Sequence, residues 1–255
     1  MSNPLPPKSL AEWLATPLGQ YLLAREHAYL DVAVADVFGY NAAQLGLPEH
    51  DFLRASRIPL KCLLAPVGPA ALRADFHDLP ISGNSIDLLI LPHVLEFSSI
   101  PHQILREVHR VLMPEGQVMI AGFNPWSLWG LRRAFNRAPD VFPWCGRFIN
   151  LPRLKDWLAL LGLEIAAGQM SCYLPPCAQD RWIQRFGFME PAGDRWWPIA
   201  GGVYFLRAIK RVRGMRVIMP KWSEQLARKK NLAAVPKKVS DRDDAVAARK
   251  PVGMQ

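Results

Sequence analysis

A histidine and a glutamate three positions apart are the residues of this chain best suited to acid–base chemistry. His93 and Glu96 stand in the stretch LPHVLE, and residues with this spacing share one face of a helix, where they can pair. An imidazole that titrates near neutral pH can remove a proton from an attacking oxygen, nitrogen or carbon acid. His93 is therefore the predicted catalytic base. The alternative is a histidine that caps the following helix, with Glu96 at the surface.

A second group of residues could enclose a substrate. The stretch NPWSLW contains Asn124, Trp126 and Trp129, an amide and two large aromatic side chains. Ligand pockets commonly combine aromatic walls with a few polar groups. We therefore expect these three residues to form the wall of a substrate pocket. The alternative is that they pack a covering helix against the body of the protein.

The cysteines do not indicate a metal or redox centre. Only Cys172 and Cys177 lie near each other among the four cysteines, and their spacing matches no standard zinc or redox motif. We therefore expect no metal site.

Three apolar runs predict the buried strands that would position the candidate residues: 58–65, 86–91 and 117–123. Such near-continuous runs are typical of parallel strands covered on both faces. Between the last two, residues 101–113 place apolar side chains on one helical face, and Pro114-Glu115-Gly116 follows. A strand, helix and parallel strand form a right-handed crossover, the building block of a doubly wound sheet.

Further elements are expected on both sides of this unit. Thr16-Pro17 is a favourable helix start, and the helix should run to a left-handed stop at Gly39. The remaining patterns predict a strand at 40–45, a helix at 151–161 and strands at 164–173 and 202–209.

The net charge of +9 is concentrated at the C-terminal end. From Arg207 onward there are 14 Lys+Arg and 4 Asp+Glu, so the totals of 31 and 22 leave 17 basic and 18 acidic residues before it. We expect residues 213–255 to form a disordered basic tail that could make weak, nonspecific contacts with nucleic-acid phosphates. The N-terminus lacks a secretory pattern and no apolar run approaches the roughly 20 residues of a membrane span, which predicts a cytoplasmic location.

The stretch DFHDLPISGNSIDLLILPHVLEF, followed by HQILREVHRVLMPEGQVMI, resembles the class I S-adenosylmethionine-dependent methyltransferases of the type 11 group. GFNPWSLWGLRR is also similar to a bacterial subgroup of these proteins, and GVYFLRAIKR resembles the end of their antiparallel final hairpin. The resemblance implies an α/β fold with a doubly wound, mostly parallel, seven-stranded Rossmann-like sheet. This domain would span residues 40–212, after a helical extension at residues 1–39.

The resemblance also implies an S-adenosylmethionine site at the C-terminal ends of the strands, the usual ligand position in such sheets. In the family, the first strand ends in a glycine-rich turn beside the methionine part of the cofactor. Gln44-Leu45-Gly46-Leu47-Pro48 is the best match, with Gln44 in place of the usual acid. The register Asp36–Gly39 would restore the acid but would shorten the long helix.

Other cofactor contacts follow from the same resemblance. Asp75 matches the position that accepts the adenine amino group, although an ordinary turn acid is the alternative. The acid that usually holds the ribose is missing, since the second strand ends in Leu64-Ala65-Pro66. The predicted cofactor-binding residues are Gln44, Gly46, Asp75, Phe76 and Pro92.

The implied function is methyl transfer from S-adenosylmethionine to a small or medium-sized substrate. The alternative is a degenerate relative that keeps the fold and acts as a binding or scaffold protein, because fold alone does not fix function.

Overall fold

The computed structural model describes residues 7–135, 141–176, 180–197 and 199–211. These residues all belong to one compact unit, residues 1–212. The basic tail and Cys177 lie outside the described residues. Within them, no helix is long and apolar enough to cross a membrane.

The described strands form a single sheet in the order β3-β2-β1-β4-β5-β7-β6. The pairs from β3 to β5 are parallel, and β7 is antiparallel to both β5 and β6. The predicted α/β fold with an antiparallel last hairpin is therefore confirmed. The strands are β1 (Asn41–Leu45), β2 (Leu60–Ala65), β3 (Leu72–Arg73), β4 (Ile86–Pro92), β5 (Leu112–Phe123), β6 (Leu163–Ser171) and β7 (Val203–Lys210).

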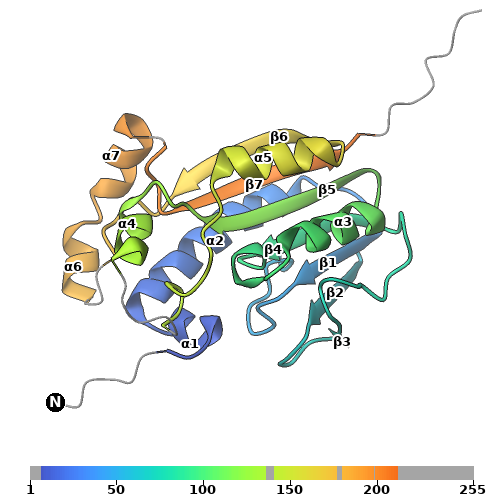
Figure 1. The fold of residues 1–255 in the computed structure, drawn as a ribbon, viewed down its shortest axis with the longest axis horizontal. Helices are drawn as coiled ribbons and strands as arrows, with labels where there is room; N and C mark the ends of the chain where they lie inside the picture. The colour runs from blue at the N-terminus through green and yellow to red at the C-terminus, as the bar shows by residue number, and fades with distance from the viewer. Residues whose placement is uncertain (1–6, 136–140, 177–179, 198, 212–255) are drawn as a thin grey trace, which may run out of the picture. The chain divides into compact units, whose positions relative to one another are not determined.

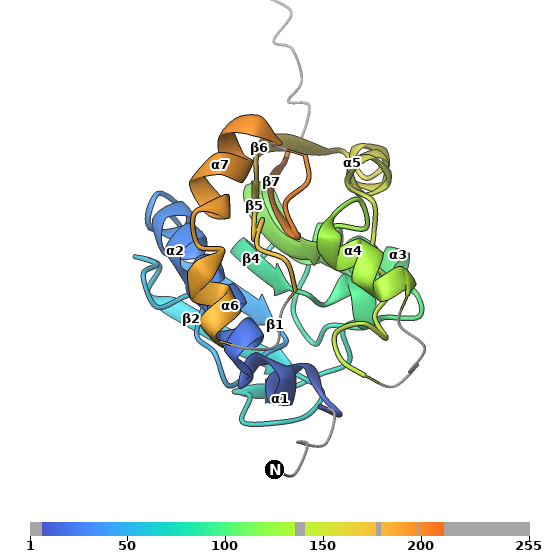
Figure 2. The ribbon, with the colours of Figure 1, turned by 90° about the vertical axis from the view of Figure 1, so that its left-hand side faces the viewer.

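Helices cover both faces of the sheet (Figures 1 and 2). On one face, α2 packs Leu22 and Leu30 with Ile90 of β4, while α3 and α5 pack Ile104 and Leu158 on the other face. Successive β4 residues contribute to the two opposite cores because side chains alternate along a strand. The helices are α1 (Leu10–Leu14), α2 (Pro17–Ala35), α3 (Pro101–Val111), α4 (Leu128–Ala134), α5 (Leu151–Leu160), α6 (Asp180–Arg185) and α7 (Met189–Trp196), with a 3-10 turn η1 (Leu95–Phe97).

Helix α2 begins as predicted and ends earlier. The Thr16 hydroxyl accepts a hydrogen bond from the Gly19 N–H, which caps the helix. The helix stops at Ala35, and Gly39 is not in the left-handed conformation, so the predicted stop at Gly39 was wrong. Gly39 is needed for space instead, because a Cβ there would lie 2.3 Å from the Cβ of Asp87.

The predicted strand–helix–strand unit is present as β4, α3 and β5. Strand β5 begins at Leu112, earlier than predicted, and pairs with Ile86 before the register shifts to Leu88 and Gln117. This irregularity contains Glu115 at φ 66°. The turn residues expected to stop the helix therefore lie inside a bulged strand.

The connections in the first half of the sheet contain no helix. Residues 46–59 join β1 to β2, and residues 66–71 join β2 to β3, through turns alone. Parallel strands are usually joined by a helix. The ends of β1 and β2 are therefore held by loops, and these loops line the candidate site.

Candidate cofactor site

A cavity of about 390 Å³ lies at the C-terminal ends of β1, β2 and β4. We call it the cofactor cavity. Strand order reverses between β1 and β4, the position where open parallel sheets bind ligands. Among the residues predicted from the sequence, the cavity is lined by Gly46, Asp75, Phe76, Pro92 and His93.

Gly46 forms the turn directly after β1, in the predicted register. Its φ of +82° favours glycine, and its N–H donates to the Leu64 carbonyl of β2 over 2.8 Å. A Cβ at this position would lie 3.2 Å from Val94 and 3.7 Å from the Phe76 ring. The bare backbone of Gly46 therefore forms part of the cavity wall, where a side chain would intrude.

Gln44 does not line the cavity, contrary to its predicted contact with the cofactor. Its side chain is buried, and its Nε2 lies within hydrogen-bond distance of the Gly46, Leu47 and His50 carbonyls, at 2.8–3.2 Å. Its Oε1 accepts from the Phe52 N–H. An amide suits this place because three carbonyls need a donor, which a carboxylate could not provide. Gln44 thus holds together the loop that replaces the missing helix.

Asp75 is exposed and paired with the histidine two residues along the chain. Its Oδ1 accepts from the His77 N–H at 2.9 Å and lies 2.6 Å from His77 Nδ1. The hydrogen bonds from His77 hold the pKa of Asp75 below its usual value. Asp75 is therefore an ionised carboxylate at the cavity wall, available to accept a hydrogen bond from an amino group.

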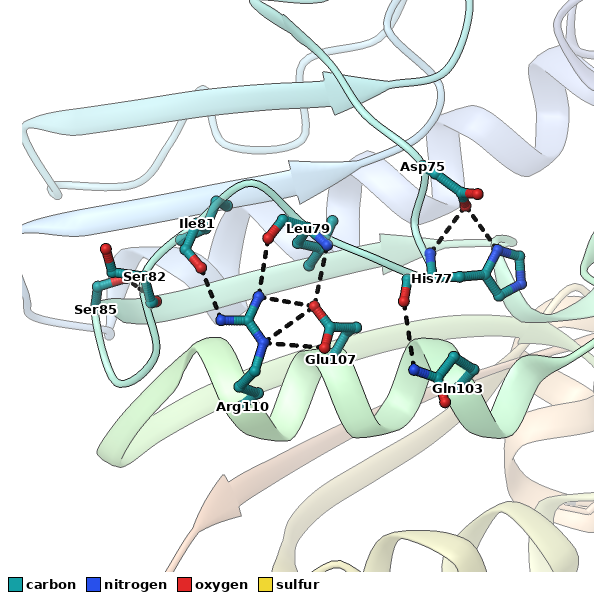
Figure 3. Close-up of polar contacts among 9 residues, drawn as sticks. All are labelled: Asp75, His77, Leu79, Ile81, Ser82, Ser85, Gln103, Glu107 and Arg110. Atoms are coloured by element: carbon teal, nitrogen blue, oxygen red, sulfur yellow. Dashed lines mark hydrogen bonds and ion pairs between the residues drawn. The ribbon is translucent and has the colours of Figure 1, made fainter.

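The segment that carries Asp75 and Phe76 is pinned to α3 (Figure 3). Glu107 accepts from the Leu79 N–H, and the Arg110 guanidinium donates to the carbonyls of Leu79 and Ile81. Arg110 also forms an ion pair with Glu107 at 2.7 Å, whose hydrogen bonds lower the pKa of that carboxyl. Side chains of α3 therefore fix this segment by hydrogen bonds to its backbone.

The side of the cavity formed by β2 is apolar. Ala65, Pro66 and Val67 line it, and no carboxylate follows the strand.

His93 is buried and paired on both ring nitrogens. Its Nε2 lies 2.5 Å from Glu26 of α2, and its Nδ1 lies 3.2 Å from Glu96. Burial alone would lower the pKa of His93, but the two carboxylates outweigh it and raise the pKa to about 10. The predicted pairing with Glu96 is confirmed. The geometry argues against the predicted base, because both ring nitrogens are already paired with buried carboxylates.

Sequence reasoning missed several residues of this region. Glu26 is a fully buried acid on the apolar face of α2, and that placement was the available signal. Leu10, Phe97 and Phe142 close the cavity from three distant segments, and no local pattern marked them.

The predicted substrate-pocket residues lie away from the cofactor cavity. Trp129 is buried, donates to the Leu174 carbonyl and packs near Trp13 and Phe123, which is the packing alternative. The Asn124 amide donates to the Ile199 and Gly201 carbonyls. Asn124 and the exposed Trp126 line a different cavity, described below.

Comparison with known proteins shows which proteins this architecture resembles. Residues 53–120 match the type 11 family model of a methyltransferase domain. An S-adenosylmethionine-dependent methyltransferase of Thermotoga maritima has the same fold, with a TM-score of 0.54 and 16% identity over 75% of this chain and 93% of that one. Residues 53–120 are therefore similar to the methyltransferase domains of the type 11 group, and the fold is one that a methyltransferase of known structure shares. The resemblance seen in the sequence is therefore confirmed.

Curated relatives match part of this chain over part of their own length. The uncharacterized protein YafS of Escherichia coli K12 is 37% identical over 107 residues, which cover 42% of this chain and 45% of YafS. A malonyl-[acyl-carrier protein] O-methyltransferase of Laribacter hongkongensis is 33% identical over 94 residues, 37% of this chain and 31% of that protein. The chain thus matches less than half the length of either relative.

Proposed function

We propose that the chain binds S-adenosylmethionine in the cofactor cavity and transfers its methyl group to a small or medium-sized substrate. The observation that carries the proposal is the meeting of the Gly46 turn and the Asp75 carboxylate in one cavity at the switch point of the sheet. The volume of about 390 Å³ lies within the range of roughly 300–1,000 Å³ common for ligand pockets.

The residues present fit two of the three parts of the cofactor. The absence of a side chain at Gly46 leaves backbone uncovered for the methionine part, and the ionised Asp75 can accept from the adenine amino group, with Phe76 beside the ring. The bound cofactor supplies an electrophilic methyl group on a sulfonium. Transfer then depends chiefly on positioning the acceptor in line with that methyl, so the proposal assigns no proton transfer to His93.

The ribose part lacks its usual carboxylate, since Ala65, Pro66 and Val67 stand there. This observation favours the second candidate function, a methyltransferase fold that has lost cofactor binding and serves as a binding or scaffold protein. The two candidates differ in whether the cavity binds the cofactor at all.

A melting experiment separates them. Full-length protein is melted with and without S-adenosylmethionine, and again with S-adenosylhomocysteine. Ligand at about a hundred times its dissociation constant adds roughly 2.7 kcal/mol, which raises the melting temperature by about 5 to 10 °C for a domain of this size. No shift with either compound at millimolar concentration favours the scaffold.

Matched variants locate the binding. Gly46→Val should abolish the shift, whereas Gly162→Val should keep it, because Gly162 also has a positive φ but lies away from the cavity with open space around its Cα. Asp75→Asn should reduce the shift, and Asp78→Asn, an exposed acid outside the cavity lining, should not. A shift unchanged by Gly46→Val and Asp75→Asn would place the binding elsewhere.

The location and partners are also proposals. We propose a cytoplasmic protein whose C-terminal tail makes weak, nonspecific contacts with nucleic-acid phosphates. Deleting residues 221–255 should abolish any nucleic-acid affinity of the full chain, and an unchanged affinity would end the tail proposal.

A further inference from the structure

A second cavity, of about 690 Å³, lies against α5, β6 and β7. We call it the α5 cavity. It shares no lining residue with the cofactor cavity, and its volume is within the range of ligand pockets. In Figure 1, α5 lies alongside β6 and β7, the antiparallel end of the sheet.

The walls of the α5 cavity are largely apolar. Ile165 and Met170 of β6 and Leu206 of β7 form the sheet side, while Leu151 and Pro152 come from the first turn of α5 and Trp126 from the loop after β5. Trp126 is 73% exposed. Binding an apolar ligand removes this surface from water, which lowers the free energy.

Glycine contributes to the shape of the cavity. Gly168 pairs with Leu206 across β6 and β7, and a Cβ on Gly168 would make only ordinary contact with Leu206, at 3.5 Å. The backbone would therefore tolerate a side chain at this position. That side chain would enter the cavity.

One charged side chain lines the α5 cavity. It is Lys155, and no acid is among the lining residues. Within the described part of the chain, no carboxylate forms an ion pair with Lys155. A single ammonium beside apolar walls complements a ligand with one negative charge at the end of an apolar chain. A lysine ammonium acts as a point charge and can pair with a carboxylate, whereas the bidentate fork that favours phosphate belongs to arginine.

We propose that the α5 cavity binds an amphipathic carboxylate, an unbranched acyl chain whose carboxylate pairs with Lys155. The acyl chain of this ligand lies against Ile165, Met170 and Leu206, in the space left by Gly168. This inference goes beyond the proposed methyl transfer and does not depend on it, because the two cavities share no residue.

Titration calorimetry with decanoate tests the proposal on the full chain, with acetate and decyltrimethylammonium as controls. Decanoate should bind, whereas acetate, which lacks the chain, and decyltrimethylammonium, which has the wrong charge, should not. Absence of decanoate binding at millimolar concentration, or equal binding of the cationic amphiphile, would overturn the proposal.

Two variants and one control variant assign the site. Gly168→Leu should weaken decanoate binding at least tenfold, and Ala167→Leu, on the opposite face of β6, should leave it unchanged. Lys155→Gln on the exposed side of α5 should weaken it at least fivefold, without disturbing the fold. Equal affinity in all three variants would place decanoate elsewhere and overturn the assignment. The melting shift with S-adenosylhomocysteine should persist in Gly168→Leu, so failure of this site is distinguishable from failure of the cofactor site.

Discussion

The carboxylate of Glu26 lies 2.5 Å from Nε2 of His93, and both side chains are fully buried. The pair joins α2 to the residue that follows β4. Glu96 completes the cluster, since its Oε1 contacts His93 Nδ1 and accepts from the Phe123 N–H at the end of β5. One cation between two carboxylates therefore connects α2, η1 and the ends of β4 and β5 beside the cofactor cavity.

The charge of His93 predicts a pH-dependent stability. The pKa of His93 is raised in the folded chain to about 10, above about 6.5 in an unfolded chain. The folded state therefore binds more protons between these values, and the free energy of unfolding should fall as pH rises through this window. The stabilisation is fully present below about pH 6.5. Urea unfolding at several pH values measures it.

His93→Asn isolates this effect from other titrations. Asparagine tolerates the positive φ of 53° at this position but leaves two buried carboxylates without their cation, which should cost about 3–5 kcal/mol near neutral pH. The difference in the free energy of unfolding between this variant and the unmodified chain should narrow as pH approaches 10. His102→Asn, at an exposed position of α3, should cost less than about 1 kcal/mol. A constant difference across pH would contradict the charged state of His93.

Gln44→Glu should destabilise the chain even though it restores the acid usual in the family. The new carboxylate would face the carbonyls of Gly46, Leu47 and His50, which now accept from Nε2. The pKa of the new carboxyl group should therefore rise. The free energy of unfolding should fall by about 2–4 kcal/mol near pH 7, and this loss should lessen near pH 4.5, where the group is protonated. Gln117→Glu is the matched control, because the Gln117 Oε1 already accepts from Arg207. Equal effects of the two variants would refute this account of Gln44.

Features that depend on residues close together in the sequence could be predicted, whereas contacts between residues far apart in the sequence could not. The unit from β4 to β5 was predictable because its apolar patterning is local, as was the N-cap at Thr16. Glu26 and His93 lie 67 positions apart, so their pairing depends on where α2 packs. The two-residue strand β3 has too little pattern to detect, and Gln44 acquires its function only because the loop after β1 folds around it.

Arg110→Met should weaken cofactor binding without touching the cofactor. Arg110 holds the carbonyls of Leu79 and Ile81 and neutralises Glu107, so its loss frees the segment that carries Asp75. We expect S-adenosylhomocysteine to bind about 5-fold more weakly, equivalent to roughly 1 kcal/mol, in calorimetric titration. Arg106→Met, at an exposed position on the same helix, should leave the affinity unchanged. Unaltered affinity in Arg110→Met would show that the hydrogen bonds of Arg110 do not position the cavity wall.

Two tryptophans three residues apart should respond in opposite ways to substitution. Trp129 is 1% exposed and donates to the Leu174 carbonyl, whereas Trp126 is 73% exposed. Trp129→Ala should therefore lower the free energy of unfolding by about 3–5 kcal/mol, because it removes a large buried ring. Trp126→Ala should change it by less than about 1 kcal/mol but weaken decanoate binding in the α5 cavity. Urea unfolding and calorimetry of both variants give the two readouts. A large loss of stability in Trp126→Ala would mean that this ring packs in the core and does not line a ligand site.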